Sequence, residues 1–221
     1  MSQVLLGRTN RYVFPIWARG RLTGDGTAEE RAERLTRALL QSPIETLDIS
    51  PAPAVWGRFL REQAIQLQIA VAAPTNLLLQ APDARIAANL VQSHIIETLC
   101  AVGRTHIDYY FLSLHEIPNE TQLSGAMEAL ELARQEGQIG AIGLAAYGKP
   151  LAILALWRTH DAFEVALLPD EAERLQTLLP EAHARRAGVV VLSEANRLPD
   201  KGQVVLSPIE QAIALASALH K

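Results

Sequence analysis

Short apolar runs alternate with longer amphipathic segments along the chain, and this alternation limits the fold more than any other feature. The runs predicted to be strands are "YVFPIWA", "ETLDIS", "IQLQIAVAA", "IDYYFLSLH", "IGAIGLAAY", "FEVALLP" and "GVVVLSEA". Several are apolar at almost every position, as is typical of strands buried on both faces of a parallel sheet. Strands that alternate with helices at this spacing predict a parallel α/β fold.

The helices between these strands are predicted from helical periodicity and from their end residues. "TAEERAERLTRALLQS" begins at Thr27, a suitable N-cap, and has acidic residues in its first turn. "RIAANLVQSHIIETLCAVG" and "LSGAMEALELARQEG" end in Gly103 and Gly137, which suit the C-terminus of a helix. Two further helices are predicted in "PDEAERLQTLLPEAHARRAG" and "SPIEQAIALASALHK". In the second of these, Ser207 and Pro208 are expected in the cap and the first turn.

Polar residues just beyond the ends of several strands favour a closed barrel over an open sheet. No G-x-G-x-x-G motif follows any predicted strand, so the dinucleotide-binding signal of an open sheet is absent. A barrel assembles its site from residues at the C-terminal ends of many strands. The residues found there are Asp48, His115, Glu116, Tyr147, Glu194 and Asn196. We therefore predict a TIM-type (β/α)8 barrel, formed by residues 1–221 as a single domain.

Composition excludes several classes of partner and site. A formal net charge of −4 and an isoelectric point near 5.9 argue against nucleic-acid or membrane-surface binding. No apolar run reaches the roughly 20 residues that a membrane span needs. With a single cysteine and no signal-peptide pattern at the start, a cytoplasmic location is expected. No ligand cluster accompanies His94 or His106, so no metal site is predicted.

Asp48 and His115 are the best chemical pair that the sequence offers. Each follows a buried strand, and both are expected at the same end of the barrel. A carboxylate beside an imidazole can raise its basicity and fix its tautomer, which suits acid–base chemistry. The alternative is structural, with Asp48 accepting backbone hydrogen bonds within its own loop.

Several stretches, in order, resemble the aldo-keto reductases. "LGRTNRYVFPIWARGRLTG" is similar to the family's opening "LGRTGLKVSPIGLGT", and "IETLDIS" occupies the place of its "FDTA". "SHIIETLCAVGRTHIDYYFLSLHEIP" resembles "SLEESLKRLGTDYIDLYLLHWPD". "ALELARQEGQIGAIGLAAYG" resembles "ALEELVKEGKIRAIGVSNYG", and "LLPEAHARRAGVVVLSEANRL" resembles "LLPLAREHGIGVLAYSPL". The resemblance covers most of the chain.

The resemblance implies a barrel that reduces carbonyls with a nicotinamide cofactor, usually NADPH, through an Asp, Tyr, Lys and His tetrad. By this match the aspartate is Asp48 and the histidine is His115. The tyrosine of "DTAxxYG" falls on Pro53, and the lysine falls on Ala73 or Pro74. The proton donor and the residue that tunes it are therefore both replaced.

The cofactor segments depart from the family as well. The "SN" that contacts the nicotinamide is replaced by Ala145 and Ala146, and Ser193 lies where the "SPLxxG" loop is expected. "SPIEQAIALASALHK" matches the family's penultimate helix, so we expect the eighth strand and helix to be missing or altered. "QVVLS" at 203–207 is one candidate to fill that gap.

Three functions follow from these observations. The first is a barrel that has lost carbonyl reduction, binds no cofactor, and acts as a binding, regulatory or structural subunit with a protein partner or by self-association. The second is an active NADP-dependent oxidoreductase in which Tyr147 replaces the tyrosine as proton donor, with Lys149 close by in sequence. The third is a lyase- or isomerase-like barrel that uses Asp48 and His115.

Overall fold

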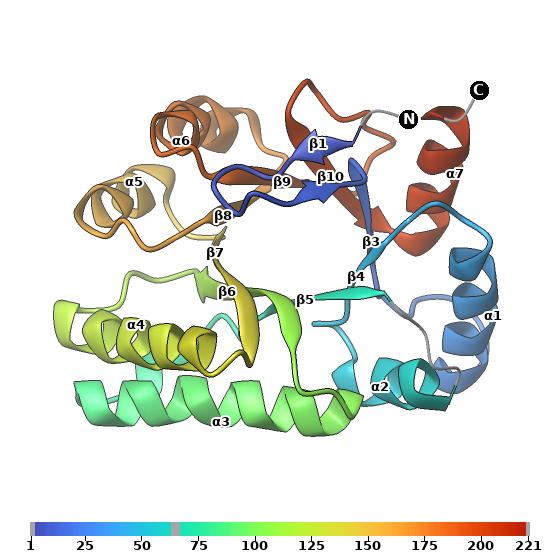
Figure 1. The fold of residues 1–221 in the computed structure, drawn as a ribbon. Coiled ribbons are helices and arrows are strands. Elements are labelled where there is room, and N and C mark those ends of the chain that lie inside the picture. Colours follow the sequence, from blue (N-terminus) through green and yellow to red (C-terminus); the bar gives the residue numbers. More distant parts are fainter. Residues whose placement is uncertain (1–2, 63–66, 220–221) are drawn as a thin grey trace.

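The chain forms a closed barrel of eight parallel strands in a computed structural model that describes residues 3–62 and 67–219 (Figure 1). The barrel confirms the predicted (β/α)8 fold. Each strand pairs with the strands before and after it, and the last pairs with the first. The strands are β3 (Ile16–Arg19), β4 (Thr46–Asp48), β5 (Gln68–Ala72), β6 (Ile107–Leu114), β7 (Ile139–Ala146), β8 (Val165–Pro169), β9 (Gly188–Leu192) and β10 (Gln203–Pro208).

The expectation of a missing eighth strand is wrong, because β10 closes the barrel. Val205 pairs with Ile16 of β3, and the same strand pairs with Val191 of β9 on its other side. Ser207 and Pro208 belong to this strand, so Pro208 lies outside the first turn of α7, and the Ser207 hydroxyl makes no capping hydrogen bond to the described residues. The altered part lies elsewhere: among the described residues, the segment 193–202 joins β9 to β10 without a helix.

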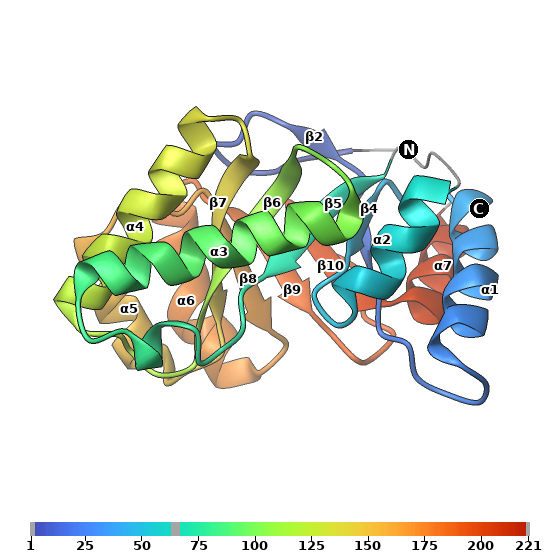
Figure 2. The ribbon, with the colours of Figure 1, turned by 90° about the horizontal axis from the view of Figure 1, so that it is seen from below.

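Seven α-helices surround the barrel within the described part of the chain. They are α1 (Ala28–Leu40), α2 (Pro53–Glu62), α3 (Ala84–Val102), α4 (Glu120–Gln135), α5 (Pro150–Thr159), α6 (Ala172–Ala184) and α7 (Ile209–Leu219), with a 3-10 turn at η1 (Leu78–Gln80). In Figure 2, α3 crosses the face seen from below and packs against α2 and α4. Because helix α7 follows β10, it is the last helix of the barrel, and the penultimate one is absent from the described residues.

The helix ends follow the sequence closely. The Thr27 hydroxyl accepts the backbone N–H of Glu30, whose carboxylate accepts the N–H of Thr27 in return, which completes a capping box. Gly103 and Gly137 adopt left-handed backbone conformations after α3 and α4, with φ of 65° and 74°. Helix α2 was not predicted, although Pro53 at its first position is compatible with a helix start.

A hairpin of β1 (Val4–Leu5) and β2 (Tyr12–Val13) covers the N-terminal end of the barrel. Leu6 and Val13 from this hairpin join the apolar cluster that fills the barrel interior. Trp17 and Tyr109 pack against each other within that cluster, with ring centroids 4.7 Å apart and ring planes tilted by 34°. The interior is thus packed at this end, and in a barrel of this type the functional site is expected at the opposite, C-terminal ends of the strands.

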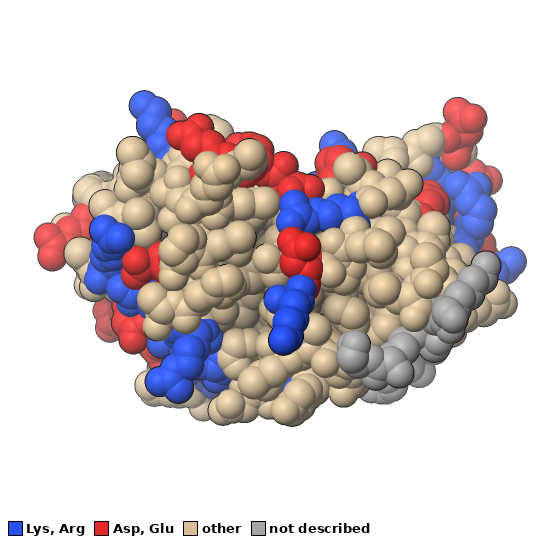
Figure 3. All heavy atoms as spheres, turned by 90° about the horizontal axis from the view of Figure 1, so that it is seen from above, with Lys and Arg blue, Asp and Glu red and all other residues tan. Residues whose placement is uncertain are grey.

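The surface carries charges of both signs. Figure 3 shows a narrow band of interleaved basic and acidic side chains across the middle of one face, and most of the rest of that face is uncharged. No helix in the described ranges is long and apolar enough to cross a membrane.

Candidate functional site

The C-terminal mouth of the barrel is lined by residues that the strand register turns inward. Trp17 and Ala70 belong to the interior cluster, and side chains two apart along a strand share a face. Arg19 therefore faces inward two positions after Trp17. Asp48 faces inward as well, because it pairs with both Arg19 and Ala70. Tyr147, two positions after interior Ala145, packs against the same cluster.

Asp48 is a buried carboxylate held by neighbours on two sides. Its Oδ1 accepts the backbone N–H of Ser50 at 2.9 Å and also the Ser50 hydroxyl. The guanidinium of Arg19 lies 3.7 Å from its Oδ2. Burial raises the pKa of Asp48, while the Ser50 hydrogen bonds and the Arg19 charge partly oppose the rise. Asp48 thus makes the loop contacts that the structural reading predicted and also pairs with a cation.

Arg19 links Asp48 to the loop after β9. Its Nη1 donates to Glu194 Oε1 at 3.0 Å, and Arg21 donates to the same oxygen at 3.1 Å. Glu194 is more than half exposed. Arg19 is partly buried, with its side chain 24% exposed. The guanidinium consequently spans the mouth from Asp48 on β4 to Glu194 beyond β9.

Tyr147 is a phenol whose pKa is affected by the charges of both Asp48 and Arg19. Burial raises its pKa, the charge of Asp48 raises it further, and the charge of Arg19 lowers it. Its backbone is fixed by Arg174 of α6, whose Nη1 donates to the carbonyls of Ala146 and Gly148 at 2.6 Å each. A buried guanidinium therefore holds the chain on both sides of Tyr147.

Ser113 adds a buried hydroxyl without a partner. It pairs in register with Ala145 of the interior cluster, so its side chain faces into the barrel. In the described part of the chain, its Oγ has no hydrogen-bond partner. The mouth thus combines a carboxylate, a guanidinium, a phenol and an unsatisfied hydroxyl in a largely desolvated setting, which can bind a small polar group by hydrogen bonds.

His115 follows β6 directly and is exposed. Among the described residues it makes no hydrogen bond or ion pair, and β5 separates its strand from that of Asp48. The structure does not join the two side chains by a direct contact. The acid–base pairing of Asp48 with His115 stays a prediction.

The residues that the resemblance assigns to the tyrosine and lysine positions lie at the start of α2 and just after β5. Pro53 is the first residue of α2. Ala73 is buried just after β5, and its N–H donates to the Phe111 carbonyl at 2.8 Å. Pro74 follows and is exposed. None of the three carries a group that can donate a proton or bear a charge at the mouth.

The three weak cofactor candidates lie in different surroundings. Ala145 and Ala146 are fully buried in β7 and face opposite sides of the strand. Ser193 is buried after β9, and its hydroxyl donates to Asp170 Oδ2 at 2.9 Å. Ser193 and Asp170 line a cleft of about 350 Å³ at the carboxyl ends of β8 and β9. The described residues contain no group of three metal-ligating side chains.

Sequence reasoning missed Arg19, Ser113 and Arg174. Arg19 carried a usable signal, since a charged residue at the inward-facing end of an apolar strand needs a partner across the sheet. Ser113 carried little signal, because a serine inside an apolar strand is common. Arg174 lies on a helix, where an arginine is ordinarily solvated.

Comparison with known proteins finds solved structures that share this fold. No protein-family model matches the sequence, and no curated protein matches it. Among solved structures, an aldo-keto reductase from Bacillus halodurans in its holo form is 16% identical with a TM-score of 0.78, covering 100% of this chain and 91% of that one. A Pseudomonas aeruginosa protein assigned to the aldo-keto reductases is 17% identical with a TM-score of 0.71, covering 100% and 98%. MGS-M4, an aldo-keto reductase from a Medee basin deep-sea metagenome library, is 13% identical with a TM-score of 0.66, covering 85% and 66%.

Proposed function

We propose, from the premise that this chain has the fold of the aldo-keto reductases, that it no longer reduces carbonyls and acts as a non-catalytic binding, regulatory or structural subunit. The observation that supports this most is the engagement of Arg19. Its guanidinium pairs with Asp48 and Glu194 across the mouth, where the family's tyrosine and lysine positions hold Pro53 and Ala73 or Pro74. The Asp48 carboxylate then balances the positive charge of Arg19. The tetrad lysine that an aspartate at this position would orient is absent.

The electrostatics of the mouth support the same proposal. A tyrosine that protonates a carbonyl oxygen works best when its pKa is lowered toward the operating pH. Burial and Asp48 raise the pKa of Tyr147. The described mouth therefore holds its only nearby phenol in a form that gives up its proton reluctantly.

A calorimetric titration with NADPH tests whether the chain has lost the ability to bind the cofactor. We expect no binding in the micromolar range. The titration is best repeated on Arg186→Gly, because Arg186 lies at the opposite end of the barrel, where an anion could bind independently (below). Micromolar binding of NADPH to both forms would contradict the proposal.

A second experiment tests the role as a subunit. Size-exclusion chromatography with light scattering should detect an oligomer, or a pull-down should recover one defined partner in stoichiometric amount. A monomer at all accessible concentrations that recovers no such partner would count against the role as a subunit. It would not affect the proposal that carbonyl reduction has been lost.

One observation favours a second candidate, an NADP-dependent oxidoreductase that reduces aldehydes or ketones with Tyr147 as donor. Tyr147 lies within electrostatic reach of both an acid and a cation, Asp48 and Arg19. In this reading Arg19 takes over the role of the family's lysine. If NADPH-dependent reduction is detected, Tyr147→Phe should abolish it while leaving NADPH affinity unchanged. Retention of the activity in Tyr147→Phe would exclude this tyrosine as donor.

A further inference from the structure

A cleft of about 860 Å³ opens at the N-terminal end of the barrel, away from the mouth. Its walls are the turn of the β1–β2 hairpin, the end of α6 and the residues that precede β8, β9 and β10. Arginines at positions 8, 185 and 186 lie beside apolar Leu5 and Val189 in this lining. The volume is within the range of small-molecule sites.

Arg186 occupies a backbone position that normally belongs to glycine. It is left-handed, with φ of 53°, and directly follows the C-cap of α6. Its N–H donates to His183 O, and the N–H of Ala187 donates to Ala182 O. These two bonds form a Schellman motif.

Helix α4 ends in the same motif with Gly137 at the equivalent position, φ 74°, where the N–H groups of Gly137 and Gln138 donate to Arg134 O and Ala133 O. An L-residue with a side chain is strained in this conformation by roughly 1 kcal/mol relative to glycine. The chain therefore uses the easier residue in one helix and the costlier one at the cleft.

The Arg186 side chain has no partner in the described chain that would account for this cost. It is exposed and makes no hydrogen bond or ion pair there. A positive charge near a helix C-terminus is favourable, but Arg185 already supplies one. The side chain is thus placed at the cleft at a conformational cost and is left free to bind.

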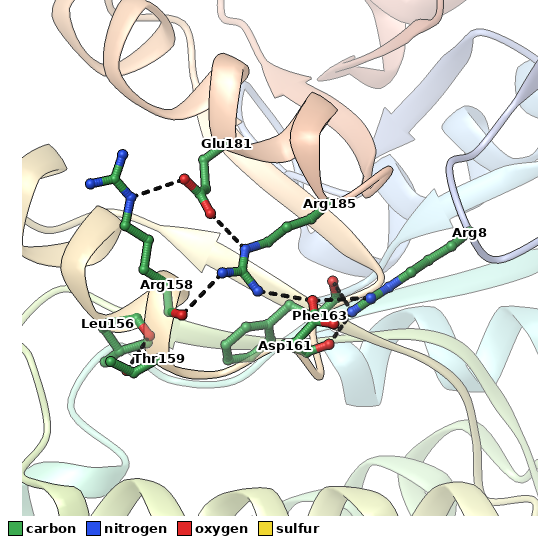
Figure 4. A network of polar contacts seen from close by, with 8 residues as sticks. All are labelled: Arg8, Leu156, Arg158, Thr159, Asp161, Phe163, Glu181 and Arg185. Atoms are coloured by element: carbon green, nitrogen blue, oxygen red, sulfur yellow. Dashed lines mark hydrogen bonds and ion pairs between the residues drawn. The ribbon is translucent and has the colours of Figure 1, made fainter.

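The neighbouring charges leave the cleft positive. Figure 4 shows Arg8, Arg158 and Arg185 around Asp161 and Glu181. Asp161 Oδ1 accepts from Arg8 at 3.1 Å and from Arg185 at 2.9 Å, and Glu181 accepts from Arg185 and Arg158. Arg158 and Glu181 lie outside the lining of the cleft, where Arg8 and Arg185 share the single carboxylate of Asp161, so one positive charge in the lining is uncompensated.

Arg186 adds a second positive charge, and His183 also lines the cleft. The chain as a whole carries a formal charge of −4, so this corner has the opposite sign. The cleft accordingly attracts anions.

A second non-glycine residue with a left-handed backbone lines the same cleft. Asn10, with φ of 56°, lies in the hairpin turn, and it and Arg186 are the two non-glycine residues with positive φ in the described chain. Backbone strain of this kind concentrates at ligand-binding sites. The turn is held against the end of α6, since the N–H of Arg8 donates to the Arg186 carbonyl at 2.7 Å.

We propose that this cleft binds a small organic phosphate, with the phosphate on the Arg186 guanidinium and the organic part against Leu5 and Val189. Guanidinium groups match phosphate oxygens in geometry and charge. Two uncompensated positive charges match the charge of a phosphate dianion. The apolar lining and the size of the cleft favour an organic phosphate over inorganic phosphate.

Calorimetric titration of the full chain with ADP as probe tests the proposal, with adenosine and inorganic phosphate as comparisons. We expect ADP to bind, inorganic phosphate to bind more weakly, and adenosine not to bind. Arg186→Gly should weaken ADP binding about tenfold or more, since a charged hydrogen-bond partner is lost. Because glycine favours the left-handed conformation, this variant should keep the fold and a melting temperature equal to or above that of the wild type.

Arg34→Ala is the matched control, because it removes an exposed arginine from α1. It should leave ADP binding unchanged. Three results would overturn the proposal: no ADP binding to the wild type at millimolar concentration, equal binding to Arg186→Gly, or adenosine binding as tightly as ADP. Inorganic phosphate binding as tightly as ADP would overturn the organic ligand class. None of these results depends on what the mouth of the barrel does.

Discussion

Arg19 and Asp48 are register partners on adjacent strands, and the Nε of Arg19 lies 3.7 Å from Oδ2 of Asp48 inside the barrel mouth. The Arg19 guanidinium supplies a positive charge that partly compensates this buried carboxylate. Ser50 supplies two hydrogen bonds from the other side. Asp48 is thereby tied to its own loop and to β3.

The burial of Asp48 predicts a pH-dependent stability. Its pKa is raised in the folded chain from an ordinary value of about 3.8. The folded state then binds the proton more tightly than the unfolded state. This contribution to stability is fully present below the ordinary pKa and is lost as pH rises through the raised one. Urea unfolding across that window should therefore show a decrease in unfolding free energy that Asp48→Asn reduces.

Arg19→Met supplies the control for this pH effect. Without the guanidinium the pKa of Asp48 should rise further, which moves the decrease in unfolding free energy to higher pH. A pH profile of unfolding that is the same in the wild type, Asp48→Asn and Arg19→Met would show that Asp48 titrates normally.

Replacement of Arg174 should destabilise the fold through the carbonyls that it holds. Arg174→Met leaves the buried carbonyls of Ala146 and Gly148 without their donor. Each unsatisfied buried acceptor costs about 1–3 kcal/mol, so a total loss of about 2–6 kcal/mol is expected in chemical denaturation. Glu171→Gln removes only the exposed partner of the same arginine and should cost less than about 1 kcal/mol. Equal losses in the two variants would contradict the role of the carbonyl contacts.

Gly125 in α4 should tolerate alanine poorly, against its helix propensity. A Cβ at this position would lie 1.9 Å from the Ala84 carbonyl oxygen at the start of α3. Overpacking costs about 1–3 kcal/mol and should exceed the roughly 1 kcal/mol that alanine gains in a helix. We expect Gly125→Ala to lower the melting temperature. Ser124→Ala, at the exposed neighbouring position, should leave it within a few degrees; a higher melting temperature for Gly125→Ala would disprove the close approach.

Periodicity predicted the strands well because burial on both faces leaves long apolar runs. "QVVLS" was only one candidate for the eighth strand, because it is short and because closure depends on its pairing with β3, which lies nearly 190 residues earlier in the sequence. Helix α2 was not predicted, and its start, "PAPAV", contains no Ser, Thr, Asp or Asn to signal an N-cap. Local sequence therefore indicates helices and strands well, but it does not indicate which distant strands pair with each other.

The site was predictable in part for the same reason. The end of a strand places Asp48 at the mouth without any knowledge of its neighbours. Its partner Arg19 depends on strand register, which the sequence does not specify residue by residue. The strain at Arg186 requires a backbone angle, although an arginine at a helix end where glycine is favoured was a visible cue.

The pairing of β10 with β3 is the one place in the barrel where distant parts of the chain meet as neighbouring strands. Every other strand pairs with strands adjacent in sequence, whereas Val205 must find Ile16. Strand-by-strand assembly can proceed locally, but the ring closes only when β10 pairs with β3. Loss of this seam would expose the backbone edges of both strands at once. Because the seam joins residues far apart in sequence, we expect it to form slowly during folding.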